Sequence, residues 1–201
     1  AMQKQEIETI LVSQRKFFAT GKTLPVSWRL EQLKTLRASM LRHEEDLYRA
    51  LKKDLGKSRM ESYMCEIGLT LSELTWMEKH IRRLTHEKRV PTPLAQFAAR
   101  SFQSPTPYGT VLIMSPWNYP VLLTLEPLID ALAAGNTAIV KPSAYAPATS
   151  AVMEQILKEI YSPEYVCMIT GGRQENQALL TQRFDKIFFT GGKTVGREVL
   201  R

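Results

Sequence analysis

The feature that most constrains this chain is a regular alternation of short apolar strands and helices after Tyr108. The runs Val111-Leu112-Ile113 and Ala138-Ile139-Val140 have the composition of parallel strands that are buried on both faces. We expect strands over 110–114, 137–140, 165–169 and 186–189, and helices over 121–134, 147–161, 175–182 and from 194 onward. This pitch predicts an α/β fold, a Rossmann-like parallel sheet with flanking helices.

The sequence before this region predicts helices, because its apolar side chains repeat at helical spacing. One stripe runs from Leu30 to Leu51 and stops at Gly56, and a second runs from about Tyr63 to Leu84. A strand over 95–103 and an extended, proline-rich stretch up to 107 follow. We therefore expect an N-terminal helical segment over 1–94, a β arm over 95–107 and the α/β region over 108–201.

The net charge of +7 is confined to the first half of the chain. The first 100 residues carry 19 Lys and Arg against 12 Asp and Glu, and the remainder carries 8 against 8. The densest basic cluster lies over 79–89, where a nucleic-acid surface is one alternative. The helical stripe turns Arg82 and Arg83 toward solvent, and neither interleaved aromatics nor a nucleic-acid motif accompanies them. We expect no nucleic-acid partner.

The remaining composition indicates a cytoplasmic protein. No stretch reaches the ~20 apolar residues of a membrane span, and the N-terminus lacks the apolar run of a signal peptide. Cys65 and Cys167 lie far apart without metal-type spacing, so we expect neither a disulfide nor a metal site. Cys167, within an expected strand, is interpreted as an inert core thiol.

Residues suited to ligand binding follow each expected strand, where open parallel sheets bind their ligands. Ser115-Pro116-Trp117-Asn118 follows the first strand. The Asn118 amide has two interpretations: it donates to a developing oxyanion, or it caps the next helix.

The other strand ends carry a lysine and glycines. Lys141, followed by Pro142-Ser143-Ala144, is placed to reach a ribose or phosphate, with a solvated strand end as the alternative. Gly171-Gly172 and the 191–196 segment open helices, where bare main-chain N–H groups can meet a phosphate. Neither segment is a G-x-G-x-x-G fingerprint or a Walker loop.

Three segments together resemble the aldehyde dehydrogenase superfamily from about Leu30 to Arg201, and look most like its class 3, fatty and aromatic aldehyde branch. They are the segments 115–120 (SPWNYP), 132–143 (LAAGNTAIVKPS) and 188–196 (FFTGGKTVG). The resemblance implies that Asn118 is the oxyanion-stabilising amide and that NAD or NADP is the cofactor. It also implies that the 97–106 stretch is an arm for a homodimer or larger homo-oligomer. The implied cofactor-binding residues are Ser115, Pro116, Trp117, Lys141, Ser143, Ala144, Gly172, Gly191, Gly192, Val195 and Gly196.

In the family, a cysteine attacks the aldehyde, the resulting thiohemiacetal loses hydride to the nicotinamide, and a glutamate activates water to release the carboxylic acid. The segments that supply this cysteine and glutamate do not occur before Arg201. We therefore expect this chain to be the cofactor-binding part of an NAD(P)-dependent aldehyde dehydrogenase, inactive alone. The alternative is a non-catalytic dinucleotide-binding or assembly module.

One departure concerns the cofactor. Family members often carry a glutamate three residues after the lysine, where it binds the ribose hydroxyls, but Ala144 occupies that place here. Removing a carboxylate removes its repulsion of a 2′-phosphate and leaves Lys141 free to meet it. We expect NADP to be tolerated, alongside NAD.

Overall fold

Four parallel strands form the centre of this computed structural model, which describes residues 4–200. The strands are β3 (Thr110–Met114), β4 (Thr137–Lys141), β5 (Val166–Met168) and β6 (Lys186–Phe189). They lie in the order β5-β4-β3-β6, and every neighbouring pair is parallel. The expected α/β fold with a parallel sheet is confirmed.

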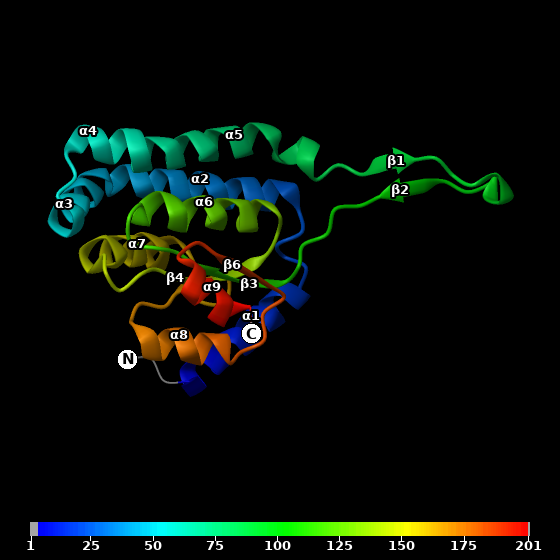
Figure 1. Ribbon diagram of the computed structural model, residues 1–201. Coiled ribbons are helices and arrows are strands. Elements are labelled where there is room, and N and C mark those ends of the chain that lie inside the picture. Colours follow the sequence, from blue (N-terminus) through cyan, green and yellow to red (C-terminus); the bar gives the residue numbers. More distant parts are fainter. Residues whose placement is uncertain (1–3, 201) are drawn as a thin grey trace.

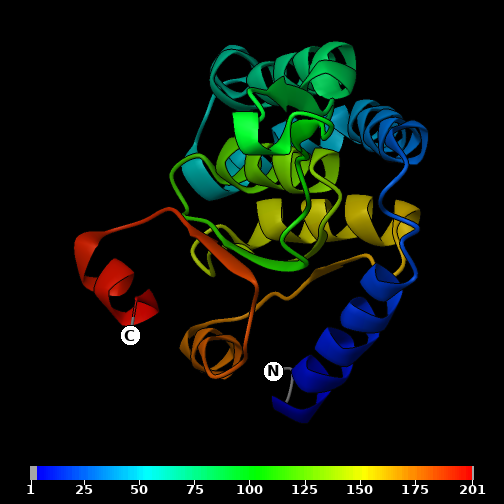
Figure 2. The ribbon, with the colours of Figure 1, turned by 90° about the vertical axis from the view of Figure 1, so that its right-hand side faces the viewer.

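Helices cover both faces of this sheet (Figures 1 and 2). One face carries α2 (Val26–Arg42), α3 (Glu44–Leu55), α5 (Gly68–Leu84), α6 (Pro120–Ala133) and α7 (Pro147–Ile160), and the other carries α1 (Lys4–Ala19), α8 (Arg173–Leu180) and α9 (Lys193–Val199). Alternate side chains of β3 serve the two cores: Val111 and Ile113 join the first, whereas Leu112 and Met114 join the second. Burial on both faces explains why residues 111–114 are all apolar.

The strand order reverses direction at β3. The chain moves outward from β3 to β4 and β5, then returns so that β6 lies on the opposite side of β3. Helices that depart in opposite directions leave a crevice at such a point, beyond the carboxyl ends of the strands. Sheets with this strand order bind their ligands in that crevice.

Two expectations for the N-terminal helices need correction. The stripe from Leu30 to Leu51 is two helices, because α2 ends at Arg42 and α3 starts at Glu44. The second stripe begins with a π-helical turn, η1 (Tyr63–Ile67), which follows the short helix α4 (Arg59–Ser62) and precedes α5. Within α5, Leu74 and Ile81 are buried as the helical spacing predicts, whereas Leu84, at the end of the stripe, is 44% exposed.

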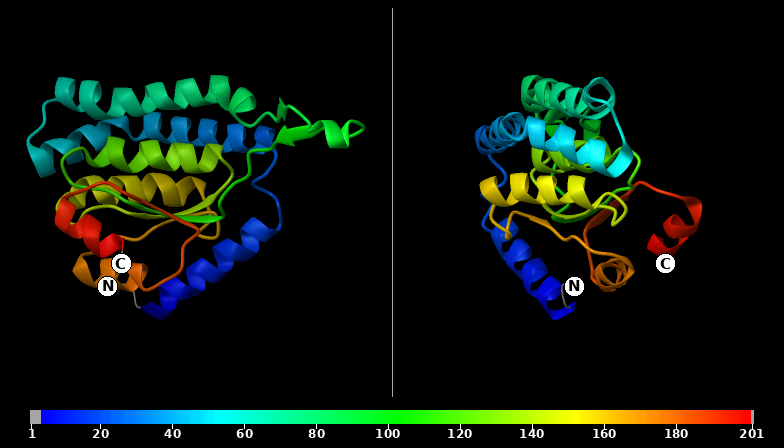
Figure 3. Two further views of the ribbon diagram at one scale, coloured as in Figure 1. Left: turned by 45° about the vertical axis from the view of Figure 1, so that its right-hand side comes forward. Right: turned by 90° about the vertical axis from the view of Figure 1, so that its left-hand side faces the viewer.

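The expected strand over 95–103 is wrong in extent. A 3-10 turn, η2 (Leu94–Gln96), occupies its beginning, and only β2 (Ser101–Gln103) is extended. This strand pairs antiparallel with β1 (Lys88–Val90), which lies within the segment expected to be helical. The two strands form an arm that projects from the body of the molecule (Figures 1 and 3).

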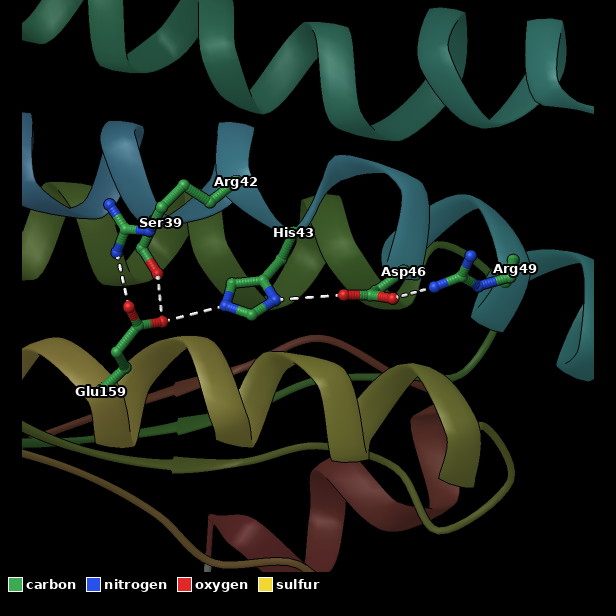
Figure 4. A network of polar contacts seen from close by, with 6 residues as sticks. All are labelled: Ser39, Arg42, His43, Asp46, Arg49 and Glu159. Carbon is green, nitrogen blue, oxygen red and sulfur yellow. Dashed lines mark hydrogen bonds and ion pairs between the residues drawn. The ribbon is translucent and has the colours of Figure 1, made fainter.

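Helix α3 holds α7 at both ends. Near the end of α3, Asp54 accepts hydrogen bonds from the main-chain N–H groups of Ala148 and Thr149, at 3.2 and 2.7 Å, in the first turn of α7. Before the start of α3, His43 Nε2 lies 2.9 Å from Glu159 of α7, and Nδ1 lies 3.2 Å from Asp46 (Figure 4). Because α7 follows the loop after β4, this clamp also fixes that loop.

Three negative observations apply to residues 4–200. None of the helices there is both long and apolar enough to span a bilayer. No cluster of His, Cys, Asp and Glu side chains in that part of the chain is arranged to hold a metal ion. Cys65 and Cys167 are both free thiols.

Candidate functional site

A pocket of about 300 Å³ lies at the carboxyl edge of the sheet, at the point where the strand order reverses. Segments that follow all four strands line it. The lining residues are Met114 to Trp117 from the end of β3, Lys141 to Tyr145 from the end of β4, Gly171 to Arg173 and Asn176 after β5, and Phe189 to Gly192 with Val195 from the end of β6. The volume is at the lower end of the range for small-molecule sites.

Ten of the eleven residues expected to contact a cofactor line this pocket. They are Ser115, Pro116, Trp117, Lys141, Ser143, Ala144, Gly172, Gly191, Gly192 and Val195. Gly196 lies outside the lining, one turn along α9, and Asn118 also lies outside it. The structure thus brings together segments that are separated by up to 80 positions in the sequence.

The side chains after β3 point in different directions. The Ser115 hydroxyl is buried and lies 2.6 Å from the hydroxyl of Thr124 on α6. That hydroxyl is therefore committed to fastening the strand end to the helix. Trp117 is 51% exposed at the mouth of the pocket, so its indole is open to a bound molecule.

Lys141 is the buried cation of the pocket, with 3% of its surface exposed. Its ammonium group donates hydrogen bonds to the carbonyl oxygens of Pro142 and Gly171, at 2.8 and 2.7 Å. An ammonium group has three donors, and the third has no acceptor among the residues described. Burial lowers the pKa of Lys141 to about 8, and the charge of Glu175 opposes part of that shift. The third N–H of Lys141 is therefore available to donate a hydrogen bond to an anionic group or to a hydroxyl group of a ligand.

The glycines after β5 have a specific structural reason. Gly171 has a φ of +135°, and a Cβ at this position would collide with the Glu175 carboxyl group. Glu175 in turn accepts a hydrogen bond from the main-chain N–H of Gly172 at 2.7 Å, at the start of α8. Because neither residue has a side chain, the main chain of Gly171 and Gly172 lies next to Lys141 and lines the pocket.

Arg173 is the most informative residue that the sequence analysis missed. It is the first residue of α8, it is exposed, and it lines the same pocket as Lys141. No aspartate or glutamate lines this pocket. A signal was available, since Arg173 directly follows the glycine pair that indicated a helix opening onto a ligand.

Asn118 lies on the turn between β3 and α6, next to the pocket. Its residue is exposed, and no hydrogen bond to its side-chain amide occurs within residues 4–200. The helix-capping interpretation is wrong, because Tyr119 occupies the N-cap position of α6 and Glu66 accepts the hydrogen bond from Val121 N–H. The amide is therefore free to serve a ligand.

The described part of the pocket contains two cations, Lys141 and Arg173, and main-chain donors, but no cysteine. Neither Cys65 nor Cys167 lines it. Burial raises the pKa of Cys167, which keeps its thiol protonated and unreactive. The arrangement can bind an anionic or sugar-containing molecule and can donate a hydrogen bond from Asn118.

Comparison with known proteins gives consistent matches. The family model described as the Aldehyde dehydrogenase family matches residues 1–201. The 4,4'-diaponeurosporen-aldehyde dehydrogenase of Staphylococcus aureus is 43% identical over 193 residues, which are 96% of this chain and 42% of that protein. Aldehyde dehydrogenase family 3 member H1 of Arabidopsis thaliana is 36% identical over 97% of this chain and 40% of its own length.

The structural comparison agrees. A solved structure described as the substrate-bound state of Staphylococcus aureus AldH superposes with a TM-score of 0.94 at 43% identity. The superposition covers 96% of this chain and 42% of that one. The chain thus spans about two fifths of the length of these relatives.

Proposed function

This chain belongs to the aldehyde dehydrogenase family, a family of oxidoreductases, and on that premise we propose that its strand-end pocket binds NAD or NADP for the oxidation of an aldehyde to a carboxylic acid. The observation that carries the proposal is Lys141, a buried cation with one unmatched donor at the reversal point of the sheet. Burying a charge is unfavourable unless a partner compensates it, so a site of this kind is built for a ligand.

The pocket fits the adenosine half of a dinucleotide. Lys141 would donate its third hydrogen bond to the ribose or to its 2′-phosphate, and exposed main chain at Gly172 and Gly192 would face phosphate oxygens. Arg173 adds a second positive charge, and Ala144 contributes no carboxylate to repel a phosphate. We therefore propose that NADP is accepted as well as NAD. When bound, the nicotinamide supplies the hydride-accepting chemistry that side chains lack.

Asn118 is the proposed catalytic residue. Its amide has no partner in the described residues and follows the segment that lines the pocket. An amide N–H that is already aimed at the aldehyde oxygen stabilises the negative charge that develops when a nucleophile adds to the carbonyl. The nucleophile and the general base would lie in the portion of the relatives that this chain does not span. We propose that the 201-residue chain binds the cofactor without turnover.

The arm is proposed to mediate assembly into a homodimer or larger homo-oligomer. Leu94 and Phe97 at its tip are 91% and 86% exposed, and apolar side chains exposed in this way are typical of surfaces that a partner covers. The two free cysteines agree with the cytoplasmic location that we propose.

Calorimetric titration with NAD and NADP tests the proposal. Lys141→Met should weaken binding of at least one cofactor tenfold or more, because a hydrogen bond to a charged group contributes ~1.5–3 kcal/mol. Lys16→Met, an exposed lysine outside the pocket, is the matched control and should change affinity less than twofold. Equal affinities in wild type and Lys141→Met would refute the assignment. Where the gene encodes a longer protein, cofactor binding by that protein without aldehyde oxidation would favour the non-catalytic module.

A further inference from the structure

A buried lysine and glutamate lie beneath the turn that carries Asn118. Lys57 follows Gly56, which ends α3, and its side chain is 8% exposed, whereas Glu66 lies in the π-helical turn and is 0% exposed. Their Nζ and Oε1 atoms are 2.5 Å apart. Two charges this far from water are unfavourable unless further hydrogen bonds satisfy them. The additional partners therefore indicate what the pair holds in place.

The additional partners of Lys57 lie on the turn itself. Its Nζ donates a second hydrogen bond to the main-chain oxygen of Asn118, at 2.8 Å. The same ammonium group lies 4.2 Å from the ring centroid of Tyr119. A cation over an aromatic ring is attracted to it, more strongly when water is excluded. One side chain thus contacts two consecutive residues of the turn.

The second oxygen of Glu66 fixes the helix that follows. Glu66 Oε2 accepts a hydrogen bond from the main-chain N–H of Val121, at 2.7 Å, in the first turn of α6. The first N–H groups of a helix have no partner within the helix, and Tyr119 at the N-cap supplies none. Burial raises the pKa of Glu66, while Lys57 and the N–H groups of Val121 and Leu122 oppose that shift.

Asn118 is consequently held through its main chain, while its side chain stays free. Lys57 fixes its carbonyl oxygen, and Glu66 fixes the chain three residues later. An amide donor lowers a reaction barrier only if it is already directed at the developing oxyanion. A displacement of about 1 Å at such a group can cost ~10²-fold in rate.

We propose that Lys57 and Glu66 are positioning residues that fix the direction of the Asn118 amide, an inference that rests on the proposed role of Asn118 in aldehyde oxidation. Neither side chain lines the strand-end pocket, so both act through the main chain of the turn. Their effect should therefore appear in the catalytic step rather than in cofactor affinity.

The test uses a catalytically competent protein that contains this chain, labelled with 5-fluorotryptophan, in which Trp117→Phe identifies the resonance of the indole beside Asn118. The variant is Lys57→Met, an unbranched side chain of similar length that removes all three donors. Arg29→Met is the matched control. Arg29 is another buried cation, 6% exposed, and donates to the carbonyl oxygen of Ala133 at the opposite end of α6, at 3.1 Å.

Lys57→Met should shift or broaden the Trp117 resonance and lower kcat at least tenfold, with KM for the cofactor changed less than twofold. Arg29→Met should lower the thermal midpoint to a similar degree and leave both the resonance and kcat in place. If Lys57→Met does not fold, Glu66→Gln replaces it, since it keeps the shape of the side chain and should move the same resonance. A lowered thermal midpoint with an unchanged resonance and kcat would overturn the proposal, because the pair would then be merely structural.

Asn118→Ala separates this failure from failure of the proposed function. Loss of one oxyanion donor should lower kcat ~10²- to 10³-fold. An unchanged kcat in Asn118→Ala would refute the role of the amide itself. The Trp117 resonance in Lys57→Met would still report whether the pair holds the turn.

Discussion

The charge of Lys141 should make the choice between NADP and NAD depend on pH. Burial lowers its pKa to about 8. The ammonium form is therefore about nine-tenths populated at pH 7 and about one-tenth populated at pH 9. The 2′-phosphate of NADP is mainly a dianion in this range, because its second pKa is ~6. A buried dianion requires the charged lysine, whereas a ribose hydroxyl can also bond to the neutral amine.

The expected magnitude follows from these populations. The apparent Kd of a ligand that binds only one form is the intrinsic Kd divided by the fraction of that form. The Kd for NADP should therefore rise about tenfold from pH 7 to pH 9, or ~1.4 kcal/mol, and the Kd for NAD should rise less. The ratio of the two constants, measured by calorimetry at each pH, removes effects that both cofactors share.

Two variants in the same pocket serve as controls. Lys141→Arg keeps its charge over the whole range, so the ratio should become independent of pH. Arg173→Gln should raise the Kd for NADP at every pH and leave the pH dependence intact, because Lys141 remains. A flat ratio in the wild type between pH 7 and pH 9 would refute the reasoning, as would a slope that persists in Lys141→Arg.

Two further predictions concern the clamp between α3 and α7. Asp54→Ala removes the acceptor for two main-chain N–H groups and should lower the free energy of unfolding by about 1 kcal/mol in urea titrations. Asp54→Asn keeps an acceptor oxygen and should retain most of that stability. Equal losses in the two variants would contradict the capping role. The pKa of His43 is raised by its hydrogen bonds to Glu159 and Asp46, so its stabilisation is complete below the unfolded pKa of ~6.5 and is lost as pH rises through the folded pKa. The urea midpoint of the wild type should therefore exceed that of His43→Gln more at pH 6 than at pH 8, and a difference independent of pH would contradict this assignment.

The sheet could be predicted from the sequence because its signal is local. Each strand is a short apolar run, and burial on both faces explains that composition without reference to distant residues. The boundary at His43 could not be predicted, since the apolar stripe continues across it without a proline or glycine. A contact to Glu159, 116 positions away, accompanies that boundary in the folded protein.

The residues that line the pocket could also be predicted from local sequence. Lys141 and the glycine segments each follow a strand, so parallel topology alone places them at one edge. Lys57 and Glu66 show where this reasoning stops. In the sequence, both have the pattern of ordinary charged residues near helices. Their burial depends on contacts with distant residues: Lys57 with Asn118, 61 positions away, and Glu66 with Val121, 55 positions away.

These distant contacts show that the N-terminal helices help to build the strand-end site. The polar groups that satisfy the starts of α6 and α7 come from that segment: Glu66 caps the start of α6, and Asp54 caps the start of α7. Helix ends without such partners leave main-chain groups unsatisfied. Since α6 follows the turn of Asn118 and α7 follows the loop of Lys141, the N-terminal helices fix the direction in which both loops leave the sheet. The ends of the strands form the pocket, and the preceding helices hold the main chain of the loops that carry Asn118 and Lys141.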